Sequence, residues 1–269
     1  MEGMEYGLGC IATPPERLEA AIDSSRSMMA ALGGPRFPDP PSNHDSTCGF
    51  TAWEWVANNY AGTCVTASEV NYKLCIGQAT LGPPIVIPDA NGINWARQNG
   101  GMNGMGIDTC LERMQKVGMT DAAGKVHTNG PYGAVNWKDQ TEAMRAIHYF
   151  KALKIGVNGS PSGILHRTHT AQSGWEVMGA RPAGVNHCVE ILGYGSAEFL
   201  ASVCKSKLTK LDPKAFCVLL FTWCSVGIVD WPSFVALCGE AWVRITDPDR
   251  GDASAWDMVA QNDFAALTA

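Results

Sequence analysis

The order in which periodic patterns occur along the chain constrains its fold more than any other feature. Apolar residues recur at helical spacing in the first half. The second half carries short apolar runs typical of strands, with no regular alternation of strand and helix. This order favours an α+β fold, in which a helical half packs against an antiparallel β-sheet. We predict helices over residues 46–61, 67–75, 107–117 and 139–149, and strands over 153–157, 187–192, 216–223 and 241–245.

The two ends of the chain differ in composition from its middle. Residues 1–45 are expected to form an N-terminal extension with one helix, which Pro14 and Pro15 open, and a stiff proline-rich connector over Pro35–Pro41. Residues 46–246 are expected to form one packed domain, followed by a C-terminal tail over 247–269.

Charge and cysteine usage exclude several classes of partner. The 269 residues carry a net charge of −6 with only 20 lysines and arginines, which argues against nucleic acid or an anionic membrane. The most apolar stretch, Ala215–Val229, is too short to cross a bilayer and predicts a buried strand. The ten cysteines include no C-x-x-C pair and no zinc spacing, so we expect reduced thiols, no metal and no cofactor.

A cysteine at the predicted start of a helix is the first candidate for chemistry. Cys48 lies in the segment Asp45-Ser-Thr-Cys-Gly-Phe-Thr-Ala-Trp, after the proline-rich connector. A helix N-terminus offers free N–H groups and a positive partial charge, which stabilise a thiolate and an oxyanion. The alternative is that Cys48 is one more small buried apolar residue.

A histidine at the start of an apolar strand is the second candidate. His187 opens the segment Asn-His-Cys-Val-Glu-Ile-Leu-Gly-Tyr-Gly, residues 186–195. An imidazole facing a helix N-terminus can accept the thiol proton and keep the sulfur nucleophilic. The alternative is a histidine whose ring is satisfied by hydrogen bonds at a strand end.

Together these segments resemble the papain-like cysteine peptidases, whose strand motif is Asn/Asp-His-Ala-Val-x-x-Val-Gly-Tyr-Gly. The 139 residues from Cys48 to His187 lie within the roughly 130–150 expected of that family. Residues 221–224, Phe-Thr-Trp-Cys, stand in place of its Asn-Ser-Trp-Gly, and residues 240–245 resemble its closing strand. The pattern also resembles papain-like proteins of phages and bacteria, many without established activity.

The resemblance implies catalysis by Cys48 and His187, and it also exposes departures from the family pattern. Phe221 stands at the position of the asparagine that orients the imidazole, and a phenyl ring accepts no N–H hydrogen bond. Another acceptor must take its place. The oxyanion glutamine, six residues before Cys48, is replaced by serine, and the adjacent Asn43 is the candidate donor. The candidates to orient His187 are Thr222, Ser225 and Asp230.

Two functions therefore remain open. The first is a peptidase, amide hydrolase or acyl transferase that acts on a peptide or protein substrate. The second is a catalytically degenerate structural or binding protein, for example a phage virion component that contacts neighbouring proteins through its N-terminal arm. With no apolar leader at the start, we expect a cytoplasmic or virion-associated location and no Sec-dependent secretion.

Overall fold

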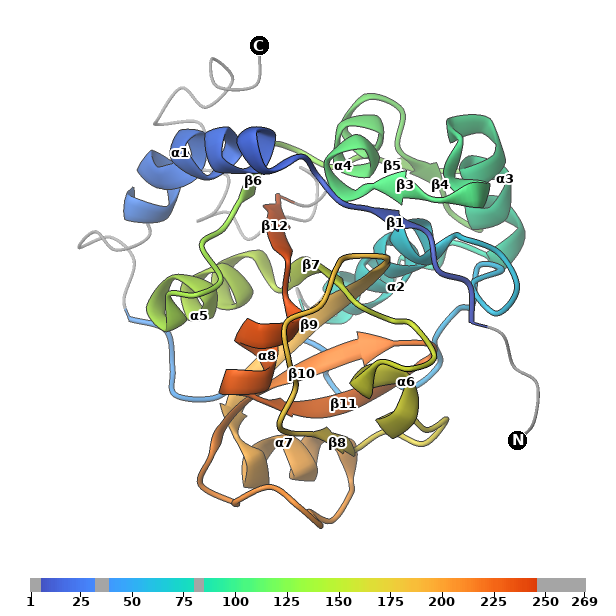
Figure 1. The fold of residues 1–269 in the computed structure, drawn as a ribbon. Helices are drawn as coiled ribbons and strands as arrows, with labels where there is room; N and C mark the ends of the chain where they lie inside the picture. The colour runs from blue at the N-terminus through green and yellow to red at the C-terminus, as the bar shows by residue number, and fades with distance from the viewer. Residues whose placement is uncertain (1–5, 32–38, 80–84, 246–269) are drawn as a thin grey trace.

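The computed structural model describes residues 6–31, 39–79 and 85–245 (Figure 1). The predicted tail over 247–269 and most of the connector Pro35–Pro41 lie outside these ranges. The described chain has the predicted helical part and the predicted sheet, so the α+β prediction is confirmed. No helix among the described residues is both long enough and apolar enough to cross a bilayer.

Three helices form the core of the helical half: α2 (Cys64–Ala79), α3 (Asp89–Asn99) and α4 (Ile107–Lys116). Helix α4 begins at the predicted residue and ends one residue before the predicted end, and Gly118 adopts the left-handed backbone of a helix end (φ +69°). Helix α2 includes the predicted helix over 67–75 but begins three residues earlier. Helix α3 was not predicted.

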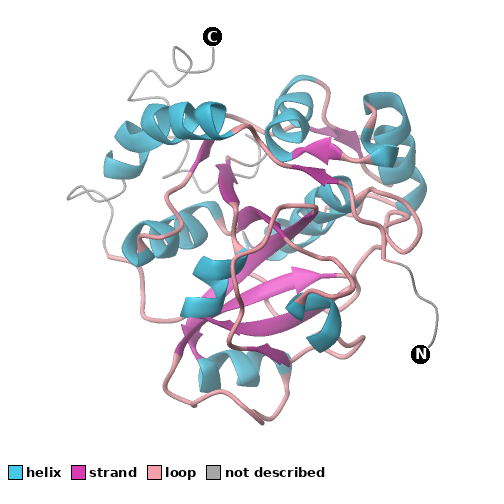
Figure 2. Cartoon of the chain, in the orientation of Figure 1, coloured by secondary structure: helices cyan, strands magenta, loops and turns pink. Residues whose placement is uncertain are grey.

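The sheet contains all four predicted strands. In spatial order its main strands are β6 (Tyr132–Ala134), β12 (Glu240–Arg244), β7 (Leu153–Val157), β9 (His187–Ser196), β10 (Phe216–Thr222), β11 (Ser225–Asp230) and β8 (Trp175–Val177). Every neighbouring pair is antiparallel except β11 and β8 (Figure 2). An additional short strand, β2 (His44–Asp45), pairs with the distal end of β9.

The two faces of the sheet build two cores, because successive strand side chains point to opposite faces. Cys188 and Leu192 of β9 pack with the helical half, whereas Val189 and Ile191 pack on the opposite face. The opposite face is covered by α5 (Gln140–Phe150), α6 (Ile164–Thr168) and α8 (Trp231–Leu237), and α7 (Ala197–Cys204) follows β9 (Figure 1).

A buried ion cluster joins α2 to the sheet. Glu69 of α2 lies 3.5 Å from Lys154 of β7 and 3.2 Å from Arg244 of β12. Arg244 forms a two-pronged contact with Glu190 of β9, at 2.9 and 3.1 Å, and its guanidinium lies 3.4 Å from the centre of the Tyr72 ring. All four charged side chains are completely buried. Their mutual pairing fixes α2 against three strands.

The N-terminal residues pack against the domain. β1 (Cys10–Ile11) pairs in parallel with β3 (Met105–Gly106), and α1 (Pro15–Ala31) lies against β6. The remaining short elements are a 3₁₀ turn over Gly101–Asn103 and a hairpin of β4 (Met119–Thr120) with β5 (Val126–His127).

The helix predicted over residues 46–61 is wrong, because turns and irregular backbone occupy this stretch. The Asp45 carboxylate accepts hydrogen bonds from the backbone N–H and the hydroxyl of Thr47, which holds a turn. Positive φ angles follow at Cys48, Gly49, Val56 and Ala57, and such angles interrupt a right-handed helix.

Candidate active site

Cys48 follows β2, which pairs with the second half of β9, whereas His187 is the first residue of β9, so the structure does not bring the two predicted partners together. Cys48 is exposed in the turn after β2, and β2 pairs with Tyr194 and Gly193. His187 is the first residue of β9, and six residues of strand span about 20 Å. Burial and the charge of Asp45 raise the pKa of the Cys48 thiol. This cysteine is therefore an ordinary surface thiol in the described structure.

The predicted oxyanion donor, Asn43, is also remote from His187. Its side-chain oxygen accepts a hydrogen bond from the N–H of Ser196, the last residue of β9, at 3.0 Å. Asn43 therefore fastens the chain near β2 to the distal end of β9. The structure does not bring it to His187.

The cysteine that starts a buried helix is Cys64, the first residue of α2. The Thr63 carbonyl accepts the first helical hydrogen bond, from Ala67 N–H, and the Thr63 hydroxyl donates to the carbonyl of Val56 at 2.6 Å. The Cys64 side chain is 1% exposed, and burial raises the pKa of its thiol to about 12. The backbone groups of Cys188 and Gly9 act in the opposite direction and lower this pKa, but burial outweighs them.

His187 is the first residue of β9, and its two ring nitrogens differ in their hydrogen bonding. Its Nε2 lies 2.7 Å from the Thr222 hydroxyl, and its ring stacks on Trp223 at 4.6 Å between centroids. Nδ1 is buried and has no hydrogen-bond partner among the described residues. Burial, with the nearby His169, lowers the pKa of His187 to about 3, so the imidazole is neutral at pH 7 in this closed arrangement.

Of the three acceptors predicted to orient His187, only Thr222 contacts it. The Ser225 hydroxyl instead lies 2.9 Å from Nε2 of His169 and accepts from the Trp175 indole. Asp230 caps α8 by accepting the N–H of Ser233, so it too is remote from the imidazole. Phe221 packs against Trp53 at 4.4 Å between ring centroids.

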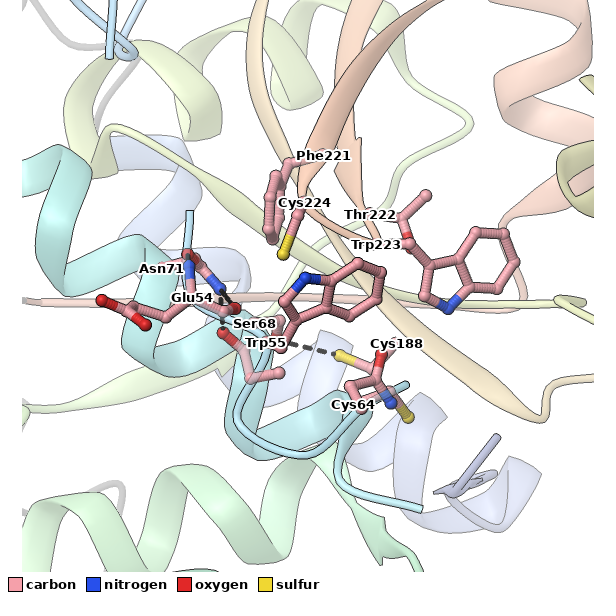
Figure 3. Close-up of a pocket in the computed structure, with 12 residues that line it drawn as sticks. Glu54, Trp55, Cys64, Ser68, Asn71, Cys188, Phe221, Thr222, Trp223 and Cys224 are labelled. Carbon is pink, nitrogen blue, oxygen red and sulfur yellow. Dashed lines mark hydrogen bonds between the residues drawn. The ribbon is translucent and has the colours of Figure 1, made fainter. Parts of the chain in front are cut away.

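A small cavity joins the helix start to the strand that orients His187. Cys64, Cys188, Thr222 and Trp223 all line it, together with Asn58 (Figure 3). Figure 3 shows Cys64 beside Cys188, with Thr222 and Trp223 approaching from β10 and the turn after it. Its volume of about 10 Å³ is at the lower limit for one water molecule. The described residues contain no group of three or more His, Cys, Asp or Glu side chains placed to hold a metal ion.

The N-terminal segment, residues 6–11, packs against residues that line this cavity, among them Asn58 and Trp223. The N–H of Gly7 donates to the carbonyl of Asn58 at 2.7 Å, and the Asn58 side-chain amide donates back to the carbonyl of Gly7 at 2.8 Å. The N–H of Cys10 donates to the carbonyl of Asn186, next to His187, at 3.1 Å. The segment therefore bridges the loop before α2 and the start of β9.

Glycine is required in this segment for steric reasons. A Cβ atom at Gly7 would lie 1.6 Å from the carbonyl oxygen of Ala61, and one at Gly9 would lie 2.0 Å from that of Gly62. Real Cβ atoms essentially never approach backbone oxygens this closely. The N-terminal segment can lie against the loop before α2 only because these two positions lack side chains.

An aromatic box holds the first described residue of the segment. The Tyr6 ring stacks on Trp223 at 4.3 Å and lies parallel to Trp55 at 6.4 Å between centroids. Its hydroxyl lies 3.2 Å from Nδ1 of His169. Tyr6 thus covers the same tryptophan that stacks on His187.

The sequence carries one signal that favours Cys64 over Cys48 as the cysteine near His187. Asn58 lies six residues before Cys64, the interval at which an oxyanion amide was sought before Cys48. Cys64 is separated from His187 by 123 residues, slightly below the expected interval, and its helix has no polar face to reveal a periodicity. The six-residue interval from Asn58 to Cys64 is therefore a better guide than the interval from the cysteine to His187.

Comparison with solved structures supports a papain-like fold. Digestive procathepsin L 3 of the Tenebrio molitor larval midgut superposes with a TM-score of 0.54 at 14% identity, covering 77% of this chain and 70% of its own. A cysteine protease that is a major ragweed pollen allergen, in its proform, gives 0.58 at 16%, covering 83% and 75%. Procathepsin L2 of the same midgut gives 0.57 at 12%, covering 89% and 84%.

Neither a family model nor a curated protein matches the sequence. The likeness to the three solved structures is therefore one of fold, and the chain has the papain-like α+β architecture.

Proposed function

We propose that this chain is a papain-like cysteine hydrolase of peptide or amide bonds, in a closed form, with Cys64 as nucleophile and His187 as base. The observation that carries the proposal is the placement of the two residues. Cys64 is the first residue of a buried helix, and His187 is the first residue of the adjacent strand. The N-terminal segment contacts both places, and Nδ1 of His187 has no hydrogen-bond partner among the described residues. The three structural neighbours are proforms according to their titles, in keeping with a closed form.

The proposed chemistry needs only groups of this chain. In an open form, Nδ1 of His187 accepts the proton of the Cys64 thiol, and the thiolate attacks a substrate carbonyl carbon. The oxyanion is held by the backbone N–H of Cys64 and by the amide of Asn58, which already binds a peptide carbonyl, that of Gly7. His187 then protonates the leaving amine, and water releases the acyl group from the sulfur.

Thr222 replaces the missing asparagine in this proposal. When Nε2–H of His187 donates to the Thr222 hydroxyl, Nδ1 is left as the acceptor that the reaction requires. The hydroxyl thereby does what a side-chain amide oxygen would do, and Phe221 needs no polar role.

A second candidate is a binding protein with a degenerate site, of which a virion component is one form. It is favoured by the hydrophobic packing of Phe221 against Trp53, and by the burial that keeps His187 uncharged. In that case the N-terminal segment is a permanent part of the fold. Substrate, partners and cellular location stay proposals under both candidates.

Hydrolysis by a variant with an opened site distinguishes the two candidates. Gly7→Ala places a methyl group against the carbonyl of Ala61 and should expel the N-terminal segment, whereas Gly184→Ala, with no atom within 4 Å of the added Cβ, is the matched control. We expect Gly7→Ala to cleave an unfolded protein substrate, and the further change Cys64→Ala to abolish cleavage. A folded Gly7→Ala protein without activity would favour the binding protein.

A further inference from the structure

Three thiols from three separate elements belong to one buried cluster, and one of them is the proposed nucleophile. Cys10 comes from β1, Cys64 from α2 and Cys188 from β9, and their exposed fractions are 5%, 1% and 3%. All three side chains belong to one buried core cluster. Cys188 is the main cause that raises the pKa of the Cys10 thiol, whereas burial is the main cause for Cys64.

The backbone holds these two cysteines in register. The N–H of Cys10 donates to the carbonyl of Asn186 at 3.1 Å, two residues before Cys188. On the other side, the carbonyl of Gly9 accepts the N–H of Met105 at 2.7 Å. The backbone of Cys10 is thus held between β3 and the start of β9, close to Cys188.

The surroundings of Cys188 favour its thiolate. The Ser68 hydroxyl lies 3.3 Å from its sulfur, and Ser68 in turn contacts the ammonium of the buried Lys154 (Figure 3 shows the contact between Ser68 and Cys188). Burial raises the pKa of Cys188, but the neighbouring Cys10 thiol and the charge of Lys154 outweigh burial, so its pKa lies below the ordinary value. The thiolate is the form that attacks a disulfide.

We propose that Cys10 and Cys188 are a site of reversible disulfide formation that fastens the N-terminal segment over Cys64. Cys10 lies on the segment that covers Cys64, and Cys188 lies on the strand that carries His187. A bond between them would therefore tie the cover to the sheet. The disulfide does not depend on the proposed function, although its effect on hydrolysis does.

The oxidant is a low-molecular-weight disulfide. During local opening of the segment, the Cys10 thiolate attacks one sulfur of the small disulfide, giving a mixed disulfide and releasing one small thiolate. When the segment closes, the Cys188 thiolate attacks the Cys10 sulfur, the protein disulfide forms and the second small thiolate leaves. Two protein thiols are oxidised and one small disulfide is reduced to two thiols. An excess of small thiol reverses both steps.

Peptide mapping tests the proposal on the full chain. The protein is incubated with oxidised glutathione, its free thiols are alkylated, and the unreduced digest is analysed by mass spectrometry. We expect a peptide that links Cys10 to Cys188 and disappears after reduction. The link should be lost in Cys10→Ser and in Cys188→Ser, and kept in Cys48→Ser, which removes an exposed thiol. A link from Cys64 to either partner, or glutathione on Cys48 with no internal link, would overturn the proposal.

Hydrogen exchange gives a readout that is independent of mapping and of activity. Oxidation should slow amide exchange across residues 7–11 by about tenfold or more, because the segment can then open only after reduction. Unchanged exchange in protein that carries the link would show that the bond does not fasten the segment. A protein that forms the link but hydrolyses nothing would leave this inference standing and count against the proposed hydrolase.

Discussion

At the scale of single residues, three partly or fully buried histidines make the closed form sensitive to acid. Burial lowers the pKa of His187 and of His44 to about 3 and that of His169 to about 4, all below the ordinary value of 6.5. As the pH falls below 6.5, the unfolded chain binds protons that the folded chain does not. The free energy of unfolding should therefore be constant above that pH and fall below it.

We expect the free energy of unfolding to be lower at pH 5 than at pH 7.5, by roughly 1–2 kcal/mol for each histidine that stays neutral in the fold. Urea denaturation at a series of pH values measures this difference, in the window above that in which carboxylates titrate. Equal stability at pH 5 and pH 7.5 would show that these imidazoles bind protons in the folded chain as readily as in the unfolded chain.

Among the described residues, the hydroxyl of Thr222 is the group that forms a hydrogen bond with the His187 ring. Replacing it in Thr222→Val leaves both ring nitrogens without partners in a buried site, which should cost about 1–3 kcal/mol of unfolding free energy. Thr222→Ser keeps the hydroxyl and should retain most of that stability, apart from the loss of one methyl group. Indistinguishable urea midpoints for the two variants would mean that the contact contributes nothing.

The candidate site was predictable from the sequence on its sheet side only. His187 and Thr222 each lie in an uninterrupted apolar run that predicts a strand. The residues on either side of them therefore suffice to place both in the sheet. Cys48 was predicted to start a helix because it follows a proline-rich connector, as a helix start often does. Cys64 has no such marker, and the segment that covers it comes from residues more than 50 positions earlier.

At the scale of elements, α2 depends on charges that it buries against the sheet. Glu69 provides the negative charge between Lys154 and Arg244, which pull its pKa down to about 2 although burial acts in the opposite direction. Since its partners stay charged, removing the Glu69 charge leaves buried cations without compensation.

Glu69→Gln should therefore lower the free energy of unfolding by about 3–5 kcal/mol. The matched control is Glu112→Gln, which removes an exposed partner of Lys116 on α4 and should change it by no more than about 0.5 kcal/mol. Thermal and urea unfolding of both variants measure the contrast. Similar losses of unfolding free energy for both variants would show that burial does not increase the contribution of the Glu69 ion cluster to stability.

Elements were predicted well where a single periodicity governs them. The strand over 153–157 has the predicted bounds, and Asp139 caps α5 next to the predicted helix start. Helix α2 is buried on nearly all sides, so apolar spacing marked only its middle. The two-residue strands β1 and β3 could not be predicted, because each exists only through pairing with a segment distant in sequence.

At the scale of the whole molecule, residues 6–11 connect the helical half, the sheet and the loop before α2. The same hydrogen bonds that hold this segment shield Cys64 and His187 from solvent. Opening it should therefore expose both residues while the two cores stay folded.

Gly7→Ala should release the segment without unfolding the domain. We expect the Met105 amide, which donates to the carbonyl of Gly9, to exchange at least tenfold faster, while amides in the centre of β9 keep their protection. Gly184→Ala should leave both regions unchanged. Faster exchange throughout β9 in Gly7→Ala would show that the segment is part of the folding unit and does not act as a cover.

Site-resolved alkylation of the ten cysteines tests most directly the claim that Cys64 is the nucleophile behind a cover. Gly7→Ala and Gly184→Ala are treated briefly with a limiting thiol-reactive electrophile at pH 6.5, where ordinary thiols of pKa about 8.5 are almost wholly protonated. Labels are then assigned by mass spectrometry.

The account predicts that Gly184→Ala is labelled slowly and only at exposed thiols such as Cys48. It predicts that Gly7→Ala is labelled first at Cys64, and that the additional change His187→Ala removes this preference. Labelling of Cys48 ahead of Cys64 in folded Gly7→Ala protein would contradict the account.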